Sequence, residues 1–235
     1  MALTLAFDVY GTLIDTHGVV EALRPRLGSR ALAFARAWRD KQLEYAFRRT
    51  VMGCYADFSV CVDQALTYTA QAFGVTLGAG ERGDLLAAYQ RLPAMSDAEP
   101  GLAALHEAGY CSYAFSNGSR EAVSKLLGDS GLRPYVRDIV SVEEAAAFKP
   151  SPAVYQLFLE RTGAAAEQTW LVSSNAFDVI GALAAGWRAA WVRRLPDAVF
   201  DPWGVEPTVT VSTLNELPQV LPPPASAAAG TRQGG

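Results

Sequence analysis

Three apolar runs of the chain are each followed by polar side chains of the kind that enzymes use. These side chains are Asp8 with Thr12, Ser116 with Asn117, and Ser173 with Asn175 and Asp178. A lysine, Lys149, lies between the second and third groups in the segment Phe-Lys-Pro-Ser-Pro. A carboxylate that a nearby cation keeps ionised can attack carbon or phosphorus and form a covalent ester-like intermediate. A second carboxylate can then activate the water that breaks this intermediate. The set therefore indicates nucleophilic chemistry, with Asp8 attacking, Lys149 as the cation and Asp178 as the base.

The runs that carry these side chains have the pattern of strands in a parallel sheet. The segment 3–8 is apolar up to Asp8, as expected for a central strand that is buried on both faces. Further strands are expected at 110–115, 138–141, 169–172, 187–192 and 209–211. Helices are expected at 101–108, 121–127, 152–162, 177–185 and 214–221. This alternation predicts an α/β fold with a doubly wound parallel sheet. Ligands bind beyond the carboxyl ends of the strands in such sheets, so the polar side chains should meet there.

A long helical stretch separates the first strand from the others. Apolar residues recur at three- and four-residue spacing within 31–49, 58–73 and 82–92. We therefore expect a mostly helical cap domain, 16–93, inserted into a core domain made of 1–15 and 94–221. The segment 222–235 is mostly Pro, Ala, Gly and Ser and is expected to be a disordered tail.

The composition narrows the possible partners. A length of 235 residues suits a core domain with an insertion, and 50% hydrophobic residues are enough for a sizeable core. A net charge of −4 without a basic block argues against nucleic acid. The 3 cysteines form no Cys-x-x-Cys pair, which suits a reducing cytosol and offers no zinc site. No apolar run is long enough for a signal peptide or a membrane helix, so we expect a soluble, cytoplasmic protein.

Four short motifs, in this order, resemble the haloacid dehalogenase superfamily. They are Asp-x-Tyr-Gly-Thr at 8–12, Ser-Asn-Gly at 116–118, Phe-Lys-Pro-x-Pro at 148–152 and Ser-Ser-Asn-x-x-Asp at 173–178. The segment 38–45, Trp-Arg-Asp-Lys-Gln-Leu-Glu-Tyr, further resembles the arginine-bearing cap helix of the L-2-haloacid dehalogenase branch. The resemblance covers roughly residues 3–221 and is specific because several motifs occur together.

The resemblance implies a cofactor-free hydrolase that converts short (S)-2-haloalkanoic acids to (R)-2-hydroxy acids. Asp8 would displace the halide from C2 in an SN2 step and form an aspartyl ester, and Asp178 would activate the water that hydrolyses it. Arg39 would stabilise the leaving halide. The residues implied to orient and charge-balance Asp8 are Thr12, Lys149, Ser173 and Asn175.

The resemblance also implies how the substrate is held. Ser116 and Asn117 would bind its carboxylate. The implied walls of the pocket, which would exclude water, are Tyr10, Leu43, Phe58, Tyr155 and Phe177. Proteins similar to this one are often homodimers, so the resemblance favours a homodimer here as well.

Two other functions remain open. A phosphatase or phosphomutase of the same superfamily would need a second Asp two residues after the nucleophile, where this chain has Tyr10. It would also need acidic ligands for Mg²⁺ where this chain has Ser173 and Asn175. We therefore expect no metal and no phosphoryl transfer. The remaining alternative is a catalytically silent protein that binds a small carboxylate, for which a nucleophile and a water activator together would be superfluous.

Several of these residues also have plain structural explanations. Asp8 could be a turn residue, Arg39 a solvated helix arginine, and Asp178 the cap of the helix that follows. Asp40 and Phe177 stand where the family usually has Gln and Trp. Because adjacent residues on a helix diverge by about 100°, Asp40 should point away from the halide site.

Overall fold

A six-stranded sheet forms the centre of the computed structural model, which describes residues 3–224. The strands are β1 (Thr4–Asp8), β2 (Cys111–Ser116), β3 (Ile139–Ser141), β4 (Thr169–Ser173), β5 (Arg188–Val192) and β6 (Val209–Val211). All neighbouring pairs are parallel, in the order β3-β2-β1-β4-β5-β6. The predicted α/β fold with a parallel sheet is confirmed.

This strand order creates a crevice beside β1. The chain leaves β3 on one side of β1 and returns as β4 on the other side. Asp8 pairs with Phe115 of β2, and Phe7 pairs with Val172 of β4. The residues that follow these strands therefore emerge at one edge of the sheet. The point at which the strand order reverses is where ligands bind in open α/β sheets.

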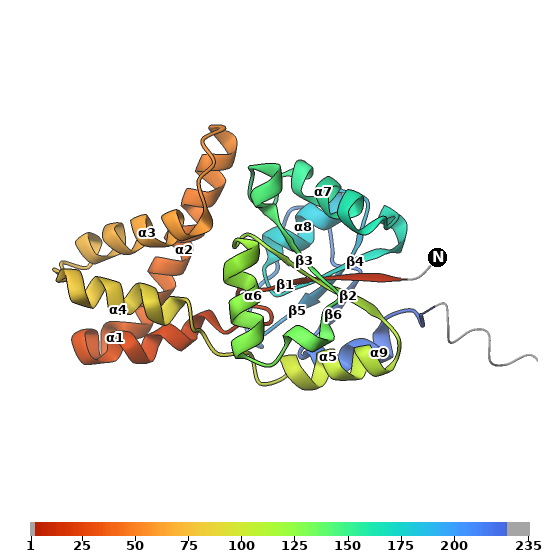
Figure 1. Cartoon of the computed structure of the whole chain (residues 1–235), viewed down its shortest axis with the longest axis horizontal. Coiled ribbons are helices and arrows are strands. Elements are labelled where there is room, and N and C mark those ends of the chain that lie inside the picture. Colours follow the sequence, from red (N-terminus) through yellow and green to blue (C-terminus); the bar gives the residue numbers. More distant parts are fainter. Residues whose placement is uncertain (1–2, 225–235) are drawn as a thin grey trace, which may run out of the picture.

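The helices that follow the insertion cover both faces of the sheet (Figure 1). They are α5 (Ala98–Glu107), α6 (Arg120–Asp129), α7 (Pro152–Thr162), α8 (Ala176–Ala184) and α9 (Leu217–Val220). α7 and α8 pack together on one face, and α5 and α9 pack together on the other. Their apolar sides seal the sheet, so that β1, β2 and β4 are almost entirely buried.

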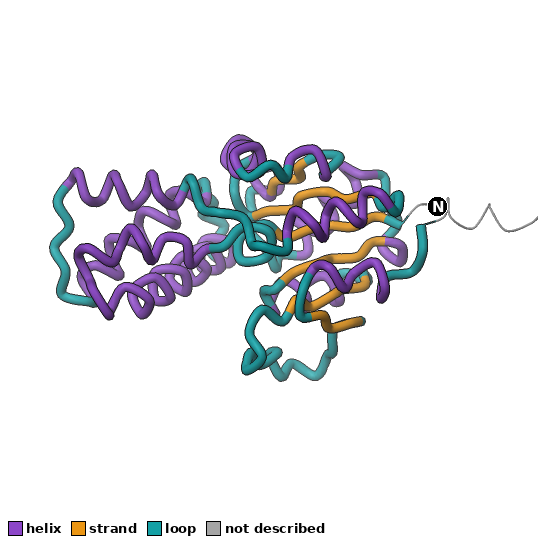
Figure 2. Tube along the Cα trace, turned by 90° about the horizontal axis from the view of Figure 1, so that it is seen from below, coloured by secondary structure: helices purple, strands orange, loops and turns teal. Residues whose placement is uncertain are grey.

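The helices between β1 and α5 gather beyond one end of the strands (Figures 1 and 2). They are α1 (Val20–Leu27), α2 (Ala31–Val51), α3 (Phe58–Ala72) and α4 (Ala79–Tyr89). In Figure 1, β1 runs from the N-terminus towards this helical group, which therefore faces the carboxyl edge of the sheet. The arrangement agrees with a helical insertion, while the boundaries of the cap domain stay a prediction.

The two connections between the insertion and the sheet lie side by side. Ile14 and Ala94 form an antiparallel bridge. The amide of Met95 donates to the carbonyl of Leu13 at 2.8 Å, and the amide of Asp15 donates to the carbonyl of Pro93 at 2.8 Å. The outgoing and returning segments are thus joined next to the loop that follows Asp8.

The structure differs from the sequence-based expectation at several helices, and α5, for example, begins at Ala98 rather than 101. α4 begins at Ala79 rather than 82, because the Glu81 carboxylate accepts from the amide of Gly78 at 2.9 Å and stabilises the first turn. The helix expected at 214–221 is a 3₁₀ turn followed by the short α9, whose first turn contains Pro218.

The expected tail lies mostly outside the described residues. Of the segment 222–235, only 222–224 are described, and the Tyr110 hydroxyl donates to the carbonyl of Pro222 at 3.1 Å. Within residues 3–224, no helix combines the length and the apolar character needed to cross a membrane.

Candidate active site

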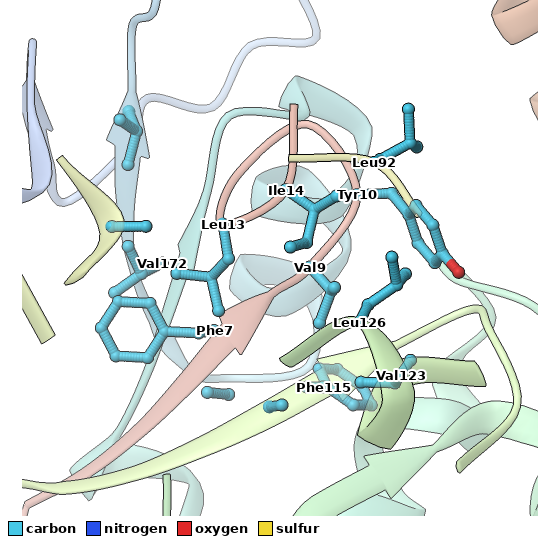
Figure 3. Close-up of a cluster of buried hydrophobic side chains, with 14 of the residues drawn as sticks. Phe7, Val9, Tyr10, Leu13, Ile14, Leu92, Phe115, Val123, Leu126 and Val172 are labelled. Carbon is cyan, nitrogen blue, oxygen red and sulfur yellow. The ribbon is translucent and has the colours of Figure 1, made fainter. Parts of the chain in front are cut away.

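The loop that follows β1 folds back on itself. The carbonyl of Val9 accepts from the amides of Thr12 at 3.2 Å and Ile14 at 2.9 Å. Figure 3 shows Val9 and Ile14 pointing into a cluster of buried apolar side chains. Gly11 makes the turn with a φ of 90°, a conformation that residues with a side chain rarely adopt. The fold of the loop returns the Thr12 hydroxyl to the Asp8 carboxylate.

One oxygen of Asp8 is anchored and the other is not. Asp8 Oδ2 accepts from Thr12 Oγ1 at 2.8 Å, Ser173 Oγ at 3.2 Å and Asn175 Nδ2 at 2.7 Å. Asp8 Oδ1 has a longer contact of 3.4 Å with Lys149 Nζ. Three donors hold the carboxylate in one orientation. Oδ1 therefore keeps the lone pairs that are available to attack an electrophile.

Lys149 links the nucleophile to a second carboxylate. Its ammonium donates to Asp178 Oδ2 at 2.7 Å and to the carbonyl of Phe115 at 2.8 Å, besides the contact with Asp8. The ammonium also lies 4.0 Å from the centre of the Phe115 ring. The backbone amide of Lys149 donates to Asn117 Oδ1 at 2.9 Å, which fixes the loop before α7. One buried cation thus serves two carboxylates.

Asp178 is completely buried and does not cap α8. Its Oδ2 accepts from Lys149, and its Oδ1 accepts from the Tyr155 hydroxyl at 2.8 Å. Burial raises the pKa of Asp178 from 3.8 to about 6, with Lys149 lowering it and Asp8 raising it. A carboxylate with such a pKa is ionised near neutral pH and is basic enough to take a proton from water.

Tyr155 contacts Asp178, and its expected place in a pocket wall stays a prediction. Its side chain is fully buried between α7 and α8, and its hydroxyl holds Asp178. Gly181 makes this approach possible, since a Cβ at that position would overlap the Tyr155 hydroxyl. Through this hydrogen bond Tyr155 orients the Asp178 carboxylate.

The turn after β2 brings Ser116 and Asn117 to the same edge. Ser116 Oγ accepts from the amide of Gly118 at 3.1 Å, and Ser141 Oγ donates to the carbonyl of Gly118 at 2.9 Å. Ser116 and Asn117 are both buried. Their position next to the start of α6 suits the binding of a small anion, because amides point outward at a helix start.

Arg39 reaches the sheet edge from α2. Its Nη2 lies 3.4 Å from the carbonyl of Tyr10, and its Nη1 lies 3.5 Å from Gln42 Oε1. Both contacts are at the long limit of hydrogen bonds, so the guanidinium retains donors for an incoming anion. Asp40 is exposed, in keeping with the divergence of neighbouring helix positions.

Aromatic rings from the loop after Asp8 and from the insertion line a large cleft. Tyr10 lies 5.7 Å from Phe58 and 5.9 Å from Tyr89, measured between ring centres. All three rings line a cleft of about 1390 Å³ between α3, α4 and the start of α6. Leu43 and Phe177, expected as further walls, lie outside this lining and are half-buried.

Comparisons with known proteins show the family of this chain. The model of the haloacid dehalogenase-like hydrolase family matches residues 3–186. The chain belongs to this family. The haloacetate dehalogenase H-2 of Moraxella sp. (strain B) is 36% identical over 92% of this chain and 96% of its own length. The (S)-2-haloacid dehalogenase 1 of Pseudomonas sp. (strain CBS-3) is 35% identical over 92% and 94%.

A solved structure of the same family has the same fold. It is the L-2-haloacid dehalogenase from Xanthobacter autotrophicus with chloropropionic acid covalently bound. The TM-score is 0.84 and the identity is 32%, covering 93% of this chain and 98% of that one. The resemblance to L-2-haloacid dehalogenases that the motifs indicate is therefore confirmed over most of the chain.

The Asp8 group offers few free oxygen atoms to the Mg²⁺ used by phosphatases of the superfamily. Asp8 Oδ2 already accepts from three donors, and the carbonyl of Tyr10 accepts from Asn175 Nδ2 at 3.1 Å and faces Arg39. The Lys149 ammonium occupies the space between the two carboxylates. Mg²⁺ prefers several free oxygen ligands. Within residues 3–224, no three His, Cys, Asp or Glu side chains gather into a group that could hold a metal ion.

Two residues that sequence reasoning missed support the Asp8 loop. The amide of Ser174 donates to Thr12 Oγ1 at 2.9 Å, and Ser174 Oγ donates to the carbonyl of Gly11 at 2.8 Å. Arg194, after β5, bonds the carbonyl of Thr12 and the carboxylate of Asp97. Ser174 stands inside a family motif, which is a usable signal. Arg194 stands in none, so its role emerges only from the fold.

Proposed function

We propose that this protein hydrolyses the carbon–halogen bond of short (S)-2-haloalkanoic acids and releases halide and an (R)-2-hydroxy acid. The observation that carries the proposal is the Asp8 carboxylate, whose Oδ2 is anchored by three donors while Oδ1 faces the buried pair of Lys149 and Asp178. The names of the relatives, which are haloacetate and (S)-2-haloacid dehalogenases, support the same reaction.

In the first step, Asp8 Oδ1 attacks C2 of the substrate from the side opposite the halogen. An oxygen–carbon bond forms, the carbon–halogen bond breaks, and its electron pair leaves with the halide. The configuration at C2 inverts, and an ester joins Asp8 to the substrate. The covalent chloropropionic acid adduct of the Xanthobacter enzyme supports this kind of intermediate.

Arg39 is the group that we assign to the leaving halide. Its guanidinium projects from α2 to the carbonyl of Tyr10 and has only long contacts with protein acceptors. A fixed positive charge in a site that excludes water stabilises developing negative charge more strongly than water does. Tyr10 and Phe58 would supply the apolar wall that keeps water out during the attack.

The substrate carboxylate would lie at the turn after β2. We assign three donors to it, which are the backbone amides of Ser116 and Asn117 and the side-chain hydroxyl of Ser116. The amide of Gly118 already donates to Ser116 Oγ, which leaves the hydroxyl proton of Ser116 for the substrate. Binding the carboxylate here would orient C2 towards Asp8.

In the second step, Asp178 takes a proton from a water molecule that attacks the carbonyl carbon of the Asp8 ester. The bond to the 2-hydroxy acid breaks, the departing oxygen takes up the proton that Asp178 removed from the water, and the water oxygen remains in the Asp8 carboxylate. Lys149 would balance the negative charge of the intermediate from its position between the two aspartates. The pKa of Asp178, about 6, suits a base that works at neutral pH.

The decisive experiment is halide release from racemic 2-chloropropionate in the presence of EDTA, with wild type and Asp8→Asn. We expect chloride from the wild type alone, ending at half of the substrate and leaving the (R)-enantiomer. A single turnover in H₂¹⁸O should place the label in Asp8. Failure of the wild type to release halide from 2-chloropropionate and haloacetate, together with Mg²⁺-dependent hydrolysis of a phosphate monoester, would establish the phosphatase alternative instead.

We also propose that the protein needs no cofactor and forms a homodimer. The exposed side chains Val51 and Met52 at the end of α2 offer apolar surface to a second copy of the chain. Sedimentation velocity should give a species of about twice the monomer mass, whereas a monomer at micromolar concentration would refute the dimer.

A further inference from the structure

A buried carboxamide on α2 lies between Arg39 and Tyr89. Gln42 is 0% exposed and is the polar member of the buried stripe of α2, whose other members include Phe34, Trp38 and Ala46. Gln42 Oε1 accepts from the Tyr89 hydroxyl at 2.7 Å and faces Arg39 Nη1 at 3.5 Å. A polar side chain on an otherwise apolar helix face calls for an explanation, because burial removes its water.

The orientation of this carboxamide is imposed by Arg39. Gln42 Nε2 is buried and has no partner within residues 3–224. Rotating the amide by half a turn would let Nε2 donate to the Tyr89 hydroxyl, but it would also point a donor at a guanidinium that has only donors. The side chain thus leaves one donor unmet and keeps its acceptor on Arg39.

Tyr89 fixes the position of that acceptor. Its ring lies 5.9 Å from Tyr10 and 5.3 Å from Trp38, and its hydroxyl donates to Gln42. Tyr10 belongs to the loop after Asp8, and its carbonyl is a further acceptor near Arg39. The guanidinium is therefore placed by one acceptor from the sheet edge and one from the insertion.

We propose that Gln42 is a positioning residue for the halide-binding arginine. Its carbonyl, held by Tyr89, keeps the Arg39 guanidinium directed at the leaving halide. This inference rests on the proposed function, in which Arg39 stabilises the halide. A neutral acceptor suits the task, because it orients the guanidinium without cancelling the charge that the halide needs. A carboxylate at position 42 would instead pair with Arg39 and neutralise it.

The proposal predicts a dependence on the leaving group. Bromide leaves carbon more readily than chloride and needs less stabilisation of its charge. A displaced guanidinium should therefore slow the release of chloride more than that of bromide. A purely structural loss at position 42 would lower the fraction of active enzyme and slow both reactions equally.

The test compares single-turnover rates for 2-chloropropionate and 2-bromopropionate. Gln42→Met has nearly the same shape and no acceptor, and Tyr89→Phe loses only the hydroxyl. We expect Gln42→Met to slow chloride release by about tenfold or more and to raise the bromide-to-chloride ratio at least threefold, with a smaller effect of the same sign for Tyr89→Phe. Gln42→Glu should slow chloride release further. Gln71→Met, on the exposed side of α3, is the matched control and should behave as wild type.

The stability of the fold distinguishes a positioning role of Gln42 from a purely structural role. The double variant Gln42→Met with Tyr89→Phe removes the whole carboxamide, with its unmet donor, together with the hydroxyl that bonds its carbonyl, so its urea midpoint should equal or exceed that of the wild type. An unchanged bromide-to-chloride ratio in Gln42→Met would overturn the positioning role, whether the rates themselves stay or fall together. A wild type that releases no halide would overturn the proposed function itself, so the two failures are distinguishable.

Discussion

Lys149 and Asp178 form an ion pair with 2.7 Å between Nζ and Oδ2, and their side chains are 1% and 0% exposed. A buried pair of this kind is tolerated only when the remaining donors and acceptors are satisfied. The carbonyl of Phe115 and the hydroxyl of Tyr155 meet that need. Because Lys149 also faces Asp8, one cation balances two carboxylates, and Arg39 supplies the second positive charge.

Replacing the shared cation should unbalance both carboxylates. We expect Lys149→Met to abolish turnover and to lower the free energy of unfolding at pH 8 by about 3–5 kcal/mol, because two buried carboxylates lose their partner. The deficit should shrink at pH 5, where a proton can neutralise one of them. Urea denaturation at both pH values measures this.

A matched control is Lys125→Met, since Lys125 pairs with Asp129 on the exposed side of α6. Its effect on stability should stay within about 1 kcal/mol. Equal stability of Lys149→Met and wild type at pH 8 would show that the buried carboxylates do not depend on this cation.

The pKa of Asp178, raised by burial from 3.8 to about 6, predicts opposite effects on activity and stability. Turnover should fall as the pH drops through about 6, because the base becomes protonated. The contribution to the free energy of unfolding should instead grow as the pH falls from about 6 to 3.8, since the native state binds a proton that the unfolded state lacks. That contribution is lost as the pH rises through about 6. Asp178→Asn, compared with wild type by pH-dependent denaturation, should lack this component; an identical profile would contradict the assignment.

Tyr155 should affect the pKa of the Asp178 carboxyl group. Its hydrogen bond lowers the pKa of Asp178, so Tyr155→Phe should move the acidic limb of the kcat profile to higher pH. We expect a several-fold loss at pH 7 that is partly recovered at pH 9. Gly181→Ala, which displaces the Tyr155 hydroxyl, should shift the limb in the same direction.

The control for this series is Tyr135→Phe, because the Tyr135 hydroxyl bonds the exposed Glu99 far from the site. Its profile should match that of the wild type. A Tyr155→Phe profile that is lowered evenly at all pH values would indicate a packing role only.

The cleft between α3, α4 and α6 should admit substituents longer than methyl. Each additional buried methylene contributes about 0.8 kcal/mol, which corresponds to roughly fourfold in kcat/KM. We expect Leu86→Trp, which narrows the cleft, to leave kcat/KM for 2-chloropropionate unchanged. The same variant should remove the increase in kcat/KM that the longer chain gives to 2-bromohexanoate. Steady-state kinetics with both acids decides the point: an equal loss for both would place Leu86 outside substrate recognition.

The sheet and its polar edge were predictable from local patterns. The apolar segment ending at Asp8 predicts a buried central strand, and the groups after β2 and β4 follow from the convergence of parallel strands. The close contacts of Asp8 with Thr12, Ser173 and Asn175 agree with that expectation.

Other features depend on tertiary structure and leave no local trace. Tyr155 has the spacing of a core or pocket residue, and only the packing of α7 against α8 aims its hydroxyl at Asp178. Gln42 meets Tyr89 across 47 positions of sequence. The start of α4 was placed too late because Glu81 compensates for the glycines around it.

The central place of β1 has a consequence for synthesis on the ribosome. Leu5 pairs with Ser112 on one side and with Trp170 on the other, so the first strand to emerge must wait for partners made much later. The helices α1–α4 are contiguous and need mainly local contacts, which form early. Asp8 is thus translated long before its last anchor, Asn175, which lies 167 positions later in the chain. A nascent chain that stops before β4 carries the nucleophile without the groups that hold it.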